Sequence, residues 1–296
     1  LSIQGLLSPI FNKWYSGFSK ADISKNEGLF MKLICSGISM SEKDFQRRAA
    51  MERDFFKFIP YVVGRTSWDK SCSLALNPQR QYFEVGEILR SEFFSASWKK
   101  TSFGSPFTLV STISNGIYKG MESIFNSASI LVDAGFSFQW NIIGASTSST
   151  EVKLSEKLIG KKAADLHLNF LGRKTASEMI DVLLQSDTYV QVSHIENSPN
   201  SVCEAMLVGV PIIASFAGGT SSIMKDGEEG ILVQDGDPYV LAGSIIHLVQ
   251  NPDLAIFYSN NAKYRALQRH NPENVYKELL SGYTSILSNF KSSDNR

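Results

Sequence analysis

Cysteine is scarce in this chain of 296 residues, and its spacing excludes two ways of stabilising a fold. The three cysteines, Cys35, Cys72 and Cys203, are odd in number and lie far apart, without a Cys-x-x-Cys pair. Neither a disulfide framework nor a thiolate metal site is therefore indicated. Because unpaired cysteines suit a reducing compartment, we expect a cytoplasmic protein.

Net charge and long apolar runs are also missing. Lysine and arginine number 29, as do aspartate and glutamate, so no global field favours nucleic acid or an anionic membrane as the main partner. No apolar run approaches the roughly 18 residues that a membrane-spanning helix needs. The chain opens at Leu1 without a basic-then-apolar leader, and we expect its natural start to lie upstream. Its length suits two domains, and 43% hydrophobic residues can form a sizeable core.

The second half of the chain alternates strand-like and helix-like segments. Short apolar runs occupy residues 107–111, 138–144, 167–172, 188–193, 211–215 and 230–233. Helical patterns lie between several of them, at about residues 119–134, 151–164, 176–186 and 199–208. This alternation predicts βαβ units, and near-continuous apolar strands suit a parallel sheet covered on both faces. We therefore predict an α/β doubly wound domain over residues 105–269.

Residues 1–104 follow a different pattern, rich in aromatic side chains. A helix is predicted at 41–58, a strand at 58–63 and a strand-to-helix turn at 65–69. That is too little for a complete doubly wound domain, so we expect the closing part of a first domain whose opening strands are missing. The aromatic side chains of Trp14, Tyr15 and Phe18 are expected in the core, with an acceptor groove or a membrane surface as alternatives.

Residues 270–296 form a tail in which one amphipathic helix is predicted at about 272–289. Its apolar positions keep helical spacing and comprise Val275, Leu279, Tyr283 and Ile286.

The most informative segment is residues 193–219, SHIENSPNSVCEAMLVGVPIIASFAGG. Ser198 suits the N-cap and Pro199 the first position of a short helix. Gly209 suits its C-terminal cap, and Pro211 prevents continuation. In an open parallel sheet, a helix that starts at the carboxyl end of a strand presents free N–H groups and a positive dipole end to a ligand. The segment therefore predicts a phosphate-binding turn.

Two carboxylates accompany this helix start. Glu196 lies in the loop before the helix, and Glu204 lies about one and a half turns inside it. Carboxylates accept hydrogen bonds from hydroxyl groups, which sugars and riboses carry in number. Taken singly, these residues are two solvated carboxylates beside an ordinary helix cap. The combination favours a nucleotide sugar.

The whole pattern resembles the donor-site motif of the retaining GT-B glycosyltransferases of family 4. The motif stands here as Glu196, Glu204-Ala205-Met206, Gly209-Val210-Pro211 and Gly218-Gly219. Further matches in order and spacing are Lys119-Gly120, Ile143-Gly144, Phe170-Leu171-Gly172, Asp226-Gly227 and Gly230-Ile231-Leu232-Val233. The resemblance covers residues 107–250 well and the first hundred weakly. It implies a GT-B fold of two Rossmann-like domains, with the N-terminal one incomplete in this chain.

The resemblance also implies roles for individual residues. Glu196 would contact hydroxyls of the donor sugar near the reaction centre, and Lys119 would neutralise the diphosphate leaving group, so both are the expected catalytic residues. Glu204 would hold the ribose. The other implied donor-binding residues are Asn197, Ser198, Pro199, Asn200, Ser201, Val202, Gly218 and Gly219. For Lys119 the alternative is an exposed residue at a helix start.

The sequence departs from the family pattern in one cation. The family usually has an arginine shortly before the lysine, whereas Thr112 occupies that stretch here. Arg173 is the candidate substitute, with a surface loop residue as the alternative. His194 is expected to be a loop residue rather than an acid or base. We read Asp235-Gly236-Asp237 as a turn and expect neither a metal nor another cofactor.

The leading prediction is a glycosyltransferase of polysaccharide biosynthesis. It would move a sugar from a nucleotide-diphosphate sugar to a saccharide or lipid-linked acceptor, with retention at the anomeric carbon. Nucleic acid is not an expected partner, and peripheral association with the inner face of a membrane stays open. A nucleotide-sugar epimerase of the same fold and a non-catalytic donor-binding module are the alternatives.

Overall fold

A six-stranded parallel sheet forms the centre of the structure, a computed structural model that describes residues 1–26 and 38–293; Cys35 lies outside them. Its strands are β3 (Phe107–Thr112), β4 (Phe138–Ile143), β5 (Leu168–Gly172), β6 (Thr188–Gln191), β7 (Ile212–Ser215) and β8 (Ile231–Val233). All six were predicted, with ends that differ by at most two residues. Their spatial order is β5-β4-β3-β6-β7-β8 with every neighbouring pair parallel. This is the strand order of doubly wound α/β folds, so the predicted fold class is confirmed.

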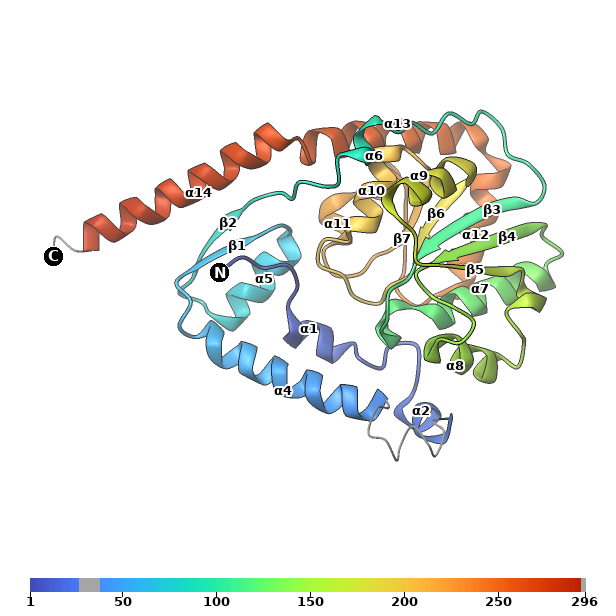
Figure 1. Ribbon diagram of the computed structural model, residues 1–296, viewed down its shortest axis with the longest axis horizontal. Coiled ribbons are helices and arrows are strands. Elements are labelled where there is room, and N and C mark those ends of the chain that lie inside the picture. The colour runs from blue at the N-terminus through green and yellow to red at the C-terminus, as the bar shows by residue number, and fades with distance from the viewer. Residues whose placement is uncertain (27–37, 294–296) are drawn as a thin grey trace.

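Helices cover both faces of this sheet (Figure 1). One face carries α7 (Met121–Asp133), α8 (Thr150–Ile159) and α12 (Pro238–Gln250), where α7 contacts both others. The other carries α6 (Glu92–Ser95), α9 (Ala176–Gln185), α10 (Asn200–Val208) and α13 (Pro252–Arg269), where α10 contacts all three others. The short elements η1 (Ile117–Lys119), η2 (Ala164–Leu166) and α11 (Thr220–Ile223) complete the connections.

Two apolar cores result, one on each side of the sheet. Phe125 of α7 packs with Trp140 of β4 in the first core, and Met206 of α10 packs with Tyr189 of β6 in the second. Every residue of β6 and of β7 is buried, including the polar Thr188, Gln191 and Ser215 at the strand ends, as expected for strands covered on both faces. Each fully buried large apolar side chain contributes roughly 1.5–3 kcal/mol to folding.

Two predicted helices were too long, and a glycine limits each of them. The helix predicted at 119–134 begins only at Met121, because Gly120 is left-handed at φ 81° and separates it from η1. The helix predicted at 151–164 ends at Ile159, because Gly160 is left-handed at φ 71°. A left-handed residue breaks the helical hydrogen-bond ladder, and glycine adopts that conformation without steric cost.

The N-terminal part contributes a second, smaller unit. Its elements are α1 (Leu7–Asn12), α2 (Lys20–Asn26), α4 (Ile38–Phe56), β1 (Tyr61–Gly64), α5 (Ser67–Leu76) and β2 (Gln81–Glu84). β1 and β2 are parallel neighbours, and Ser2 forms a parallel bridge with Val63 at the other edge of β1. A capping box between Thr66 and Asp69 starts α5, as expected for the turn after β1. The domain boundaries at residues 104 and 269 stay predictions.

The predicted tail helix is α14 (Pro272–Ser293), which extends beside the N-terminal unit (Figure 1). Glu278 accepts a hydrogen bond from the Gly86 backbone N–H at 2.9 Å, and Gly282 packs against Phe83. Val275 is buried, but Tyr283 is 54% exposed, so the predicted apolar stripe is only partly covered. α14 thereby links the end of the six-stranded domain to β2.

The aromatic side chains near the N-terminus lie mostly in the core, as predicted. Trp14 and Phe18 are buried in a cluster with Phe45 of α4 and Leu154 of α8, and Tyr15 is partly buried against it. This cluster connects the N-terminal unit to the six-stranded domain.

No single helix within residues 1–26 and 38–293 has both the length and the apolarity of a membrane span. Only α12 and α13 taken together pass such a test, and they are bent by 103° relative to each other.

Candidate functional site

The strand order places one crevice at the centre of the sheet. The chain runs outward in opposite directions from β3 and β6, which are neighbours, and ligands of doubly wound folds bind at the carboxyl ends of such a strand pair. The loop after β3 contains Lys119, and the loop after β6 contains Glu196. The two residues expected to be catalytic therefore lie where the fold forms its ligand crevice.

Lys119 and Glu196 form an ion pair in this crevice. Lys119 Nζ donates to Glu196 Oε1 at 2.7 Å, and their side chains are 18% and 19% exposed. The pair spans 77 positions of sequence. A partly buried cation beside a carboxylate that can accept sugar hydroxyls provides both groups that the resemblance implies. The exposed-residue alternative for Lys119 is not what the structure shows.

Glycines allow the loops of this site to approach each other closely. A side chain at Gly120 would collide with the Val192 carbonyl, and the His194 N–H donates to the Tyr118 carbonyl at 2.9 Å in the same region. A side chain at Gly218 would likewise collide with the Glu196 carbonyl oxygen. Only glycine fits such contacts.

Gly219 has the same close approach one residue later. A side chain there would collide with the Asn197 carbonyl oxygen, and its own N–H donates to the Glu196 carbonyl at 2.9 Å. The structure therefore places the two glycines that we expected to bind donor behind the loop of residues 196–197, where they support its backbone.

The start of α10 differs from the prediction by one residue. Pro199 is the N-cap, Asn200 is the first helical residue, and no side chain caps the helix. Ser198 was expected at the N-cap, but its hydroxyl donates to Glu87 Oε1 at 2.5 Å. Because a carboxylate is a strong acceptor, the Ser198 hydroxyl bonds to Glu87 and does not cap the helix.

The free N–H groups at this helix start are those of Asn200 and Ser201. The N–H groups of Val202 and Cys203 both donate to the Pro199 carbonyl, at 2.9 and 3.1 Å. The first four N–H groups of an α-helix have no regular partner within it; here Pro199 has no N–H and Val202 bonds to the Pro199 carbonyl, which leaves those of Asn200 and Ser201. A phosphate at this helix end would therefore meet Asn200 and Ser201, and Val202 less directly than expected.

Asn197 joins the loop after β6 to the N-terminal unit. Its Oδ1 accepts a hydrogen bond from Thr66 Oγ1 at 2.8 Å, and the asparagine is 4% exposed. Thr66 also accepts from the Asp69 N–H as the N-cap of α5. A residue expected to bind donor thus holds the site against α5, a contact that no local sequence pattern indicates.

Glu204 is held by Arg90, which the sequence analysis did not identify. Arg90 Nε and Nη2 donate to Glu204 Oε1 and Oε2, each at 2.8 Å. The glutamate side chain is 7% exposed. A buried carboxylate needs a charged or hydrogen-bonding partner. From the sequence, only this requirement could have indicated that Glu204 has a cationic partner.

Arg173, the expected substitute cation, lies elsewhere. It follows β5 at the edge of the sheet and is exposed, two strands from β3. No contact described for residues 1–26 and 38–293 joins it to Lys119 or Glu196. Thr112 ends β3 itself. The structure therefore gives Arg173 the place of a surface loop residue.

His194 is a loop residue with both ring nitrogens engaged. Nε2 lies 2.6 Å from Glu122 Oε1, and Nδ1 lies 2.5 Å from Asp235 Oδ1. Burial alone would lower the pKa of His194, but the hydrogen bonds to these two carboxylates and their charges raise it to about 9. Burial would raise the pKa of Asp235, and hydrogen bonds from His194 and Lys13 hold it below its usual value. His194 is thus a cation that fixes the loop two residues before Glu196.

The turn predicted at residues 235–237 is present, and its two aspartates make different contacts. Asp237 is the N-cap of α12 and accepts from the Tyr239 and Val240 N–H groups at 3.0 Å. Asp235 instead binds His194 and, at 3.0 Å, Lys13 of the segment after α1.

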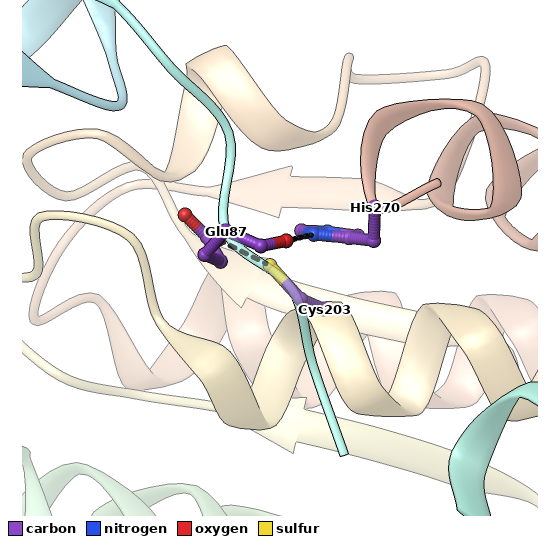
Figure 2. Close-up of side chains that lie close together, drawn as sticks. All are labelled: Glu87, Cys203 and His270. Carbon is purple, nitrogen blue, oxygen red and sulfur yellow. Dashed lines mark hydrogen bonds between the residues drawn. The ribbon is translucent and has the colours of Figure 1, made fainter. Parts of the chain in front are cut away.

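Potential metal ligands gather at a second place, behind α10 (Figure 2). A carboxylate oxygen of Glu87, Cys203 Sγ and a ring nitrogen of His270 lie within 4.8 Å of one another and are buried. The sequence analysis did not find this group, because its members are far apart in the chain.

Hydrogen bonds and a guanidinium engage part of this group, whereas Glu87 Oε2 and His270 Nε2 have no hydrogen-bond partner among the described residues. Arg65 Nε lies 3.3 Å from Glu87 Oε2, and His270 Nδ1 donates to the Glu87 carbonyl at 2.9 Å. Burial raises the pKa of the Cys203 thiol and lowers that of His270, so both are neutral. Binding of a metal ion here would have to release the proton of the thiol. The contacts of this group join the β2–α6 segment, α10 and the end of α13.

Comparison with known proteins places this chain in a family. The family model described as "Glycosyl transferases group 1" matches residues 96–265, more than half of the 296 residues. The capsular polysaccharide biosynthesis glycosyltransferase CapM of Staphylococcus aureus is 24% identical over 169 residues, which are 57% of this chain and 43% of CapM. An uncharacterized glycosyltransferase of Methanocaldococcus jannaschii is 32% identical over 133 residues, 43% of this chain and 34% of that protein. The chain thus spans less than half the length of these curated relatives.

A solved structure shows the same architecture over most of the chain. HepE of Anabaena, crystallised with UDP-glucose, superposes with a TM-score of 0.63 at 15% identity, covering 97% of this chain and 71% of HepE. This likeness supports the GT-B type of fold that the motif predicted.

Proposed function

Because this chain belongs to the glycosyl transferases group 1 family, we propose that it binds a nucleotide-diphosphate sugar between the ends of β3 and β6 and transfers the glycosyl group, with retention, to a saccharide or lipid-linked acceptor. The observation that carries the proposal is the Lys119–Glu196 pair at 2.7 Å in the crevice beside the start of α10. The other observations concern the parts of the donor.

The helix start and Lys119 would serve the diphosphate. The N–H groups of Asn200 and Ser201, with the positive end of the α10 dipole, suit a phosphate group. Lys119 would stabilise the negative charge that grows on the leaving diphosphate as the bond to the anomeric carbon breaks, which is electrostatic stabilisation of the transition state. We propose that these groups work without a metal and that no other cofactor takes part.

Glu196 and Glu204 would recognise hydroxyl groups on either side of the diphosphate. Glu196, on the loop, would accept from the donor sugar, and Glu204, one helical turn beyond Asn200 on the same face, would accept from the ribose. Lys119 holds the Glu196 carboxylate in position before the donor arrives. The UDP-glucose in HepE makes uridine nucleotides the first donors to test.

An acceptor would approach from the N-terminal side of the crevice. A hollow of about 310 Å³ lies beside the loop before Lys119, and its lining includes Trp14, Phe45, Tyr118 and Glu151. The partly exposed Tyr118 ring and Glu151 carboxylate suit the apolar ring face and hydroxyls of a saccharide, whereas Trp14 and Phe45 belong to the buried cluster behind the hollow's surface. We also propose that the protein is cytoplasmic and contacts the inner face of a membrane peripherally.

Incubation of the purified chain with radiolabelled nucleotide sugars, with and without an acceptor extract, tests this function. Label that moves to acceptor, with the anomeric configuration of the donor kept in the product by NMR coupling, is the expected result. Interconversion of the donor without acceptor would instead identify an epimerase. Donor binding without turnover would leave a donor-binding module. Lys119→Ala is the matched inactive control, because it removes the proposed leaving-group cation.

A further inference from the structure

Arg90 binds both oxygens of the Glu204 carboxylate and uses part of its hydrogen-bonding capacity. Arg90 comes from the segment between β2 and α6, 114 positions from Glu204, and meets both carboxylate oxygens at 2.8 Å. The carboxylate is buried, whereas 42% of the Arg90 side chain is exposed. The pair therefore joins a buried acceptor on α10 to a cation that reaches the surface.

Arg90 is held in a single orientation by its other neighbours. Its guanidinium carbon lies 4.6 Å from the ring centroid of Phe93, which is fully buried in α6. Its Nη2 also lies 3.5 Å from the sulfur of Met179 in α9. A guanidinium stacked on a ring and forked onto a carboxylate has little rotational freedom left. The fork therefore determines the orientation of the Glu204 carboxylate.

We propose that Arg90 is a positioning residue of the donor site, which holds Glu204 so that its free lone pairs face the ribose diol of the nucleotide. The inference rests on the proposed function, since it takes the ligand to be a nucleotide sugar. A carboxylate has about four acceptor sites, and the fork uses one on each oxygen. The two that remain match two vicinal hydroxyls.

Lysine cannot replace arginine in this arrangement. Its ammonium group is a point charge on a flexible stem and keeps the charge balance of Glu204 without the planar fork. Arg90→Lys should therefore leave the carboxylate charged and paired but free to rotate. The ribose would then lose its aligned acceptors, while the phosphate contacts at Asn200 and Ser201 would be unaffected.

Deoxyribose ligands separate this role from a general structural one. Calorimetry on the full chain would compare a nucleoside diphosphate with its 2′-deoxy and 3′-deoxy forms, using whichever of UDP, GDP and ADP binds the wild type. In the wild type, loss of one hydroxyl should weaken binding about 10-fold, as expected for a hydrogen bond to a charged group. Arg90→Lys should bind the ribose ligand about 10-fold more weakly and discriminate against the deoxy forms less than about 3-fold.

Turnover gives a second readout, and another arginine gives the control. In Arg90→Lys the donor KM should rise about 10-fold while kcat stays within about 3-fold, because the change removes binding away from the reacting bond. Arg47→Lys also alters an arginine paired with a carboxylate, that of Asp44, but on the exposed surface of α4. It should match the wild type in both assays.

The outcomes distinguish this inference from the proposed function. If the wild type binds none of the three nucleoside diphosphates, the proposed function fails. If the wild type discriminates and Arg90→Lys either weakens ribose and deoxyribose ligands equally or changes neither, the role of Arg90 is wrong. Should Arg90→Lys not fold, Glu204→Gln is compared with the double variant Arg90→Gln/Glu204→Gln. The single variant should keep part of the discrimination and the double variant none; equal discrimination would overturn the inference.

Discussion

Raising the pH should unfold this protein more easily, because His194 loses a charge that the buried carboxylate of Glu122 and the partly buried carboxylate of Asp235 stabilise. The ring lies 2.6 Å from Glu122 and 2.5 Å from Asp235, and its pKa is raised from 6.5 to about 9. Lys13, 3.0 Å from Asp235, is the other charged neighbour. Since the folded pKa lies above the unfolded one, this stabilisation is complete below about pH 6.5 and is lost as the pH rises through about 9.

The size of the effect follows from the two pKa values. Each unit of difference corresponds to about 1.4 kcal/mol, so a shift from 6.5 to about 9 stabilises the fold by about 3 kcal/mol. His194 is only 4% exposed, so solvent screens the interaction little. Between these pH values the free energy of unfolding should fall with a slope that approaches one proton, about 1.4 kcal/mol per pH unit.

Urea unfolding at a series of pH values would measure this slope. His194→Gln should be less stable at every pH, because Glu122 and Asp235 lose their shared cation. Its free energy of unfolding should depend less steeply on pH than that of the wild type, with a slope smaller by one proton. His247→Gln, on the exposed side of α12, should keep the wild-type slope. Equal slopes in the wild type and His194→Gln would refute the reasoning.

Three further predictions concern the crevice. Glu204→Gln should weaken nucleoside diphosphate binding about 10-fold. Glu196→Gln should leave that affinity within about 3-fold but slow turnover at least 10-fold. If the two variants change affinity and turnover rate equally, the separate roles are wrong. Lys119→Ala should lower donor affinity and flatten its dependence on ionic strength, and an unchanged salt response argues against a contact with the diphosphate. Gly218→Ala should lower the free energy of unfolding by about 2–4 kcal/mol in urea, because Gly218 is left-handed at φ 54° and the new side chain would collide with the Glu196 carbonyl. Gly135 is also left-handed, at φ 69°, but has open space around it, so the control variant Gly135→Ala should lower this free energy by only about 1 kcal/mol.

The strands of the larger domain could be predicted because burial determines their sequence. β6 and β7 are covered on both faces, so apolar residues dominate them, with polar Thr188, Gln191 and Ser215 only at the strand ends. Helix ends were harder to predict. Gly120 and Gly160 stop helices in left-handed conformations, and a glycine in a helical pattern does not reveal its backbone angle from sequence alone.

The candidate site was predictable where it follows chain order and not where it depends on distant partners. Lys119 and Glu196 meet because both follow central strands of one sheet. Ser198 was misassigned because a serine before a proline is a good helix cap in isolation, whereas Glu87, 111 positions away, supplies a charged acceptor. Nothing in the local pattern around either residue indicates that pairing.

The polar contacts of the proposed donor motif reach residues outside the family-matched segment. Asn197 is bound by Thr66, Ser198 by Glu87 and Glu204 by Arg90. All three partners lie between residues 66 and 90, before the matched segment that begins at residue 96. Each is a hydrogen bond to a buried or charged group, of the kind that orients a side chain strongly. The motif residues therefore owe their orientation to the N-terminal unit and its connection, and a movement of that unit would reach the donor crevice through these three contacts.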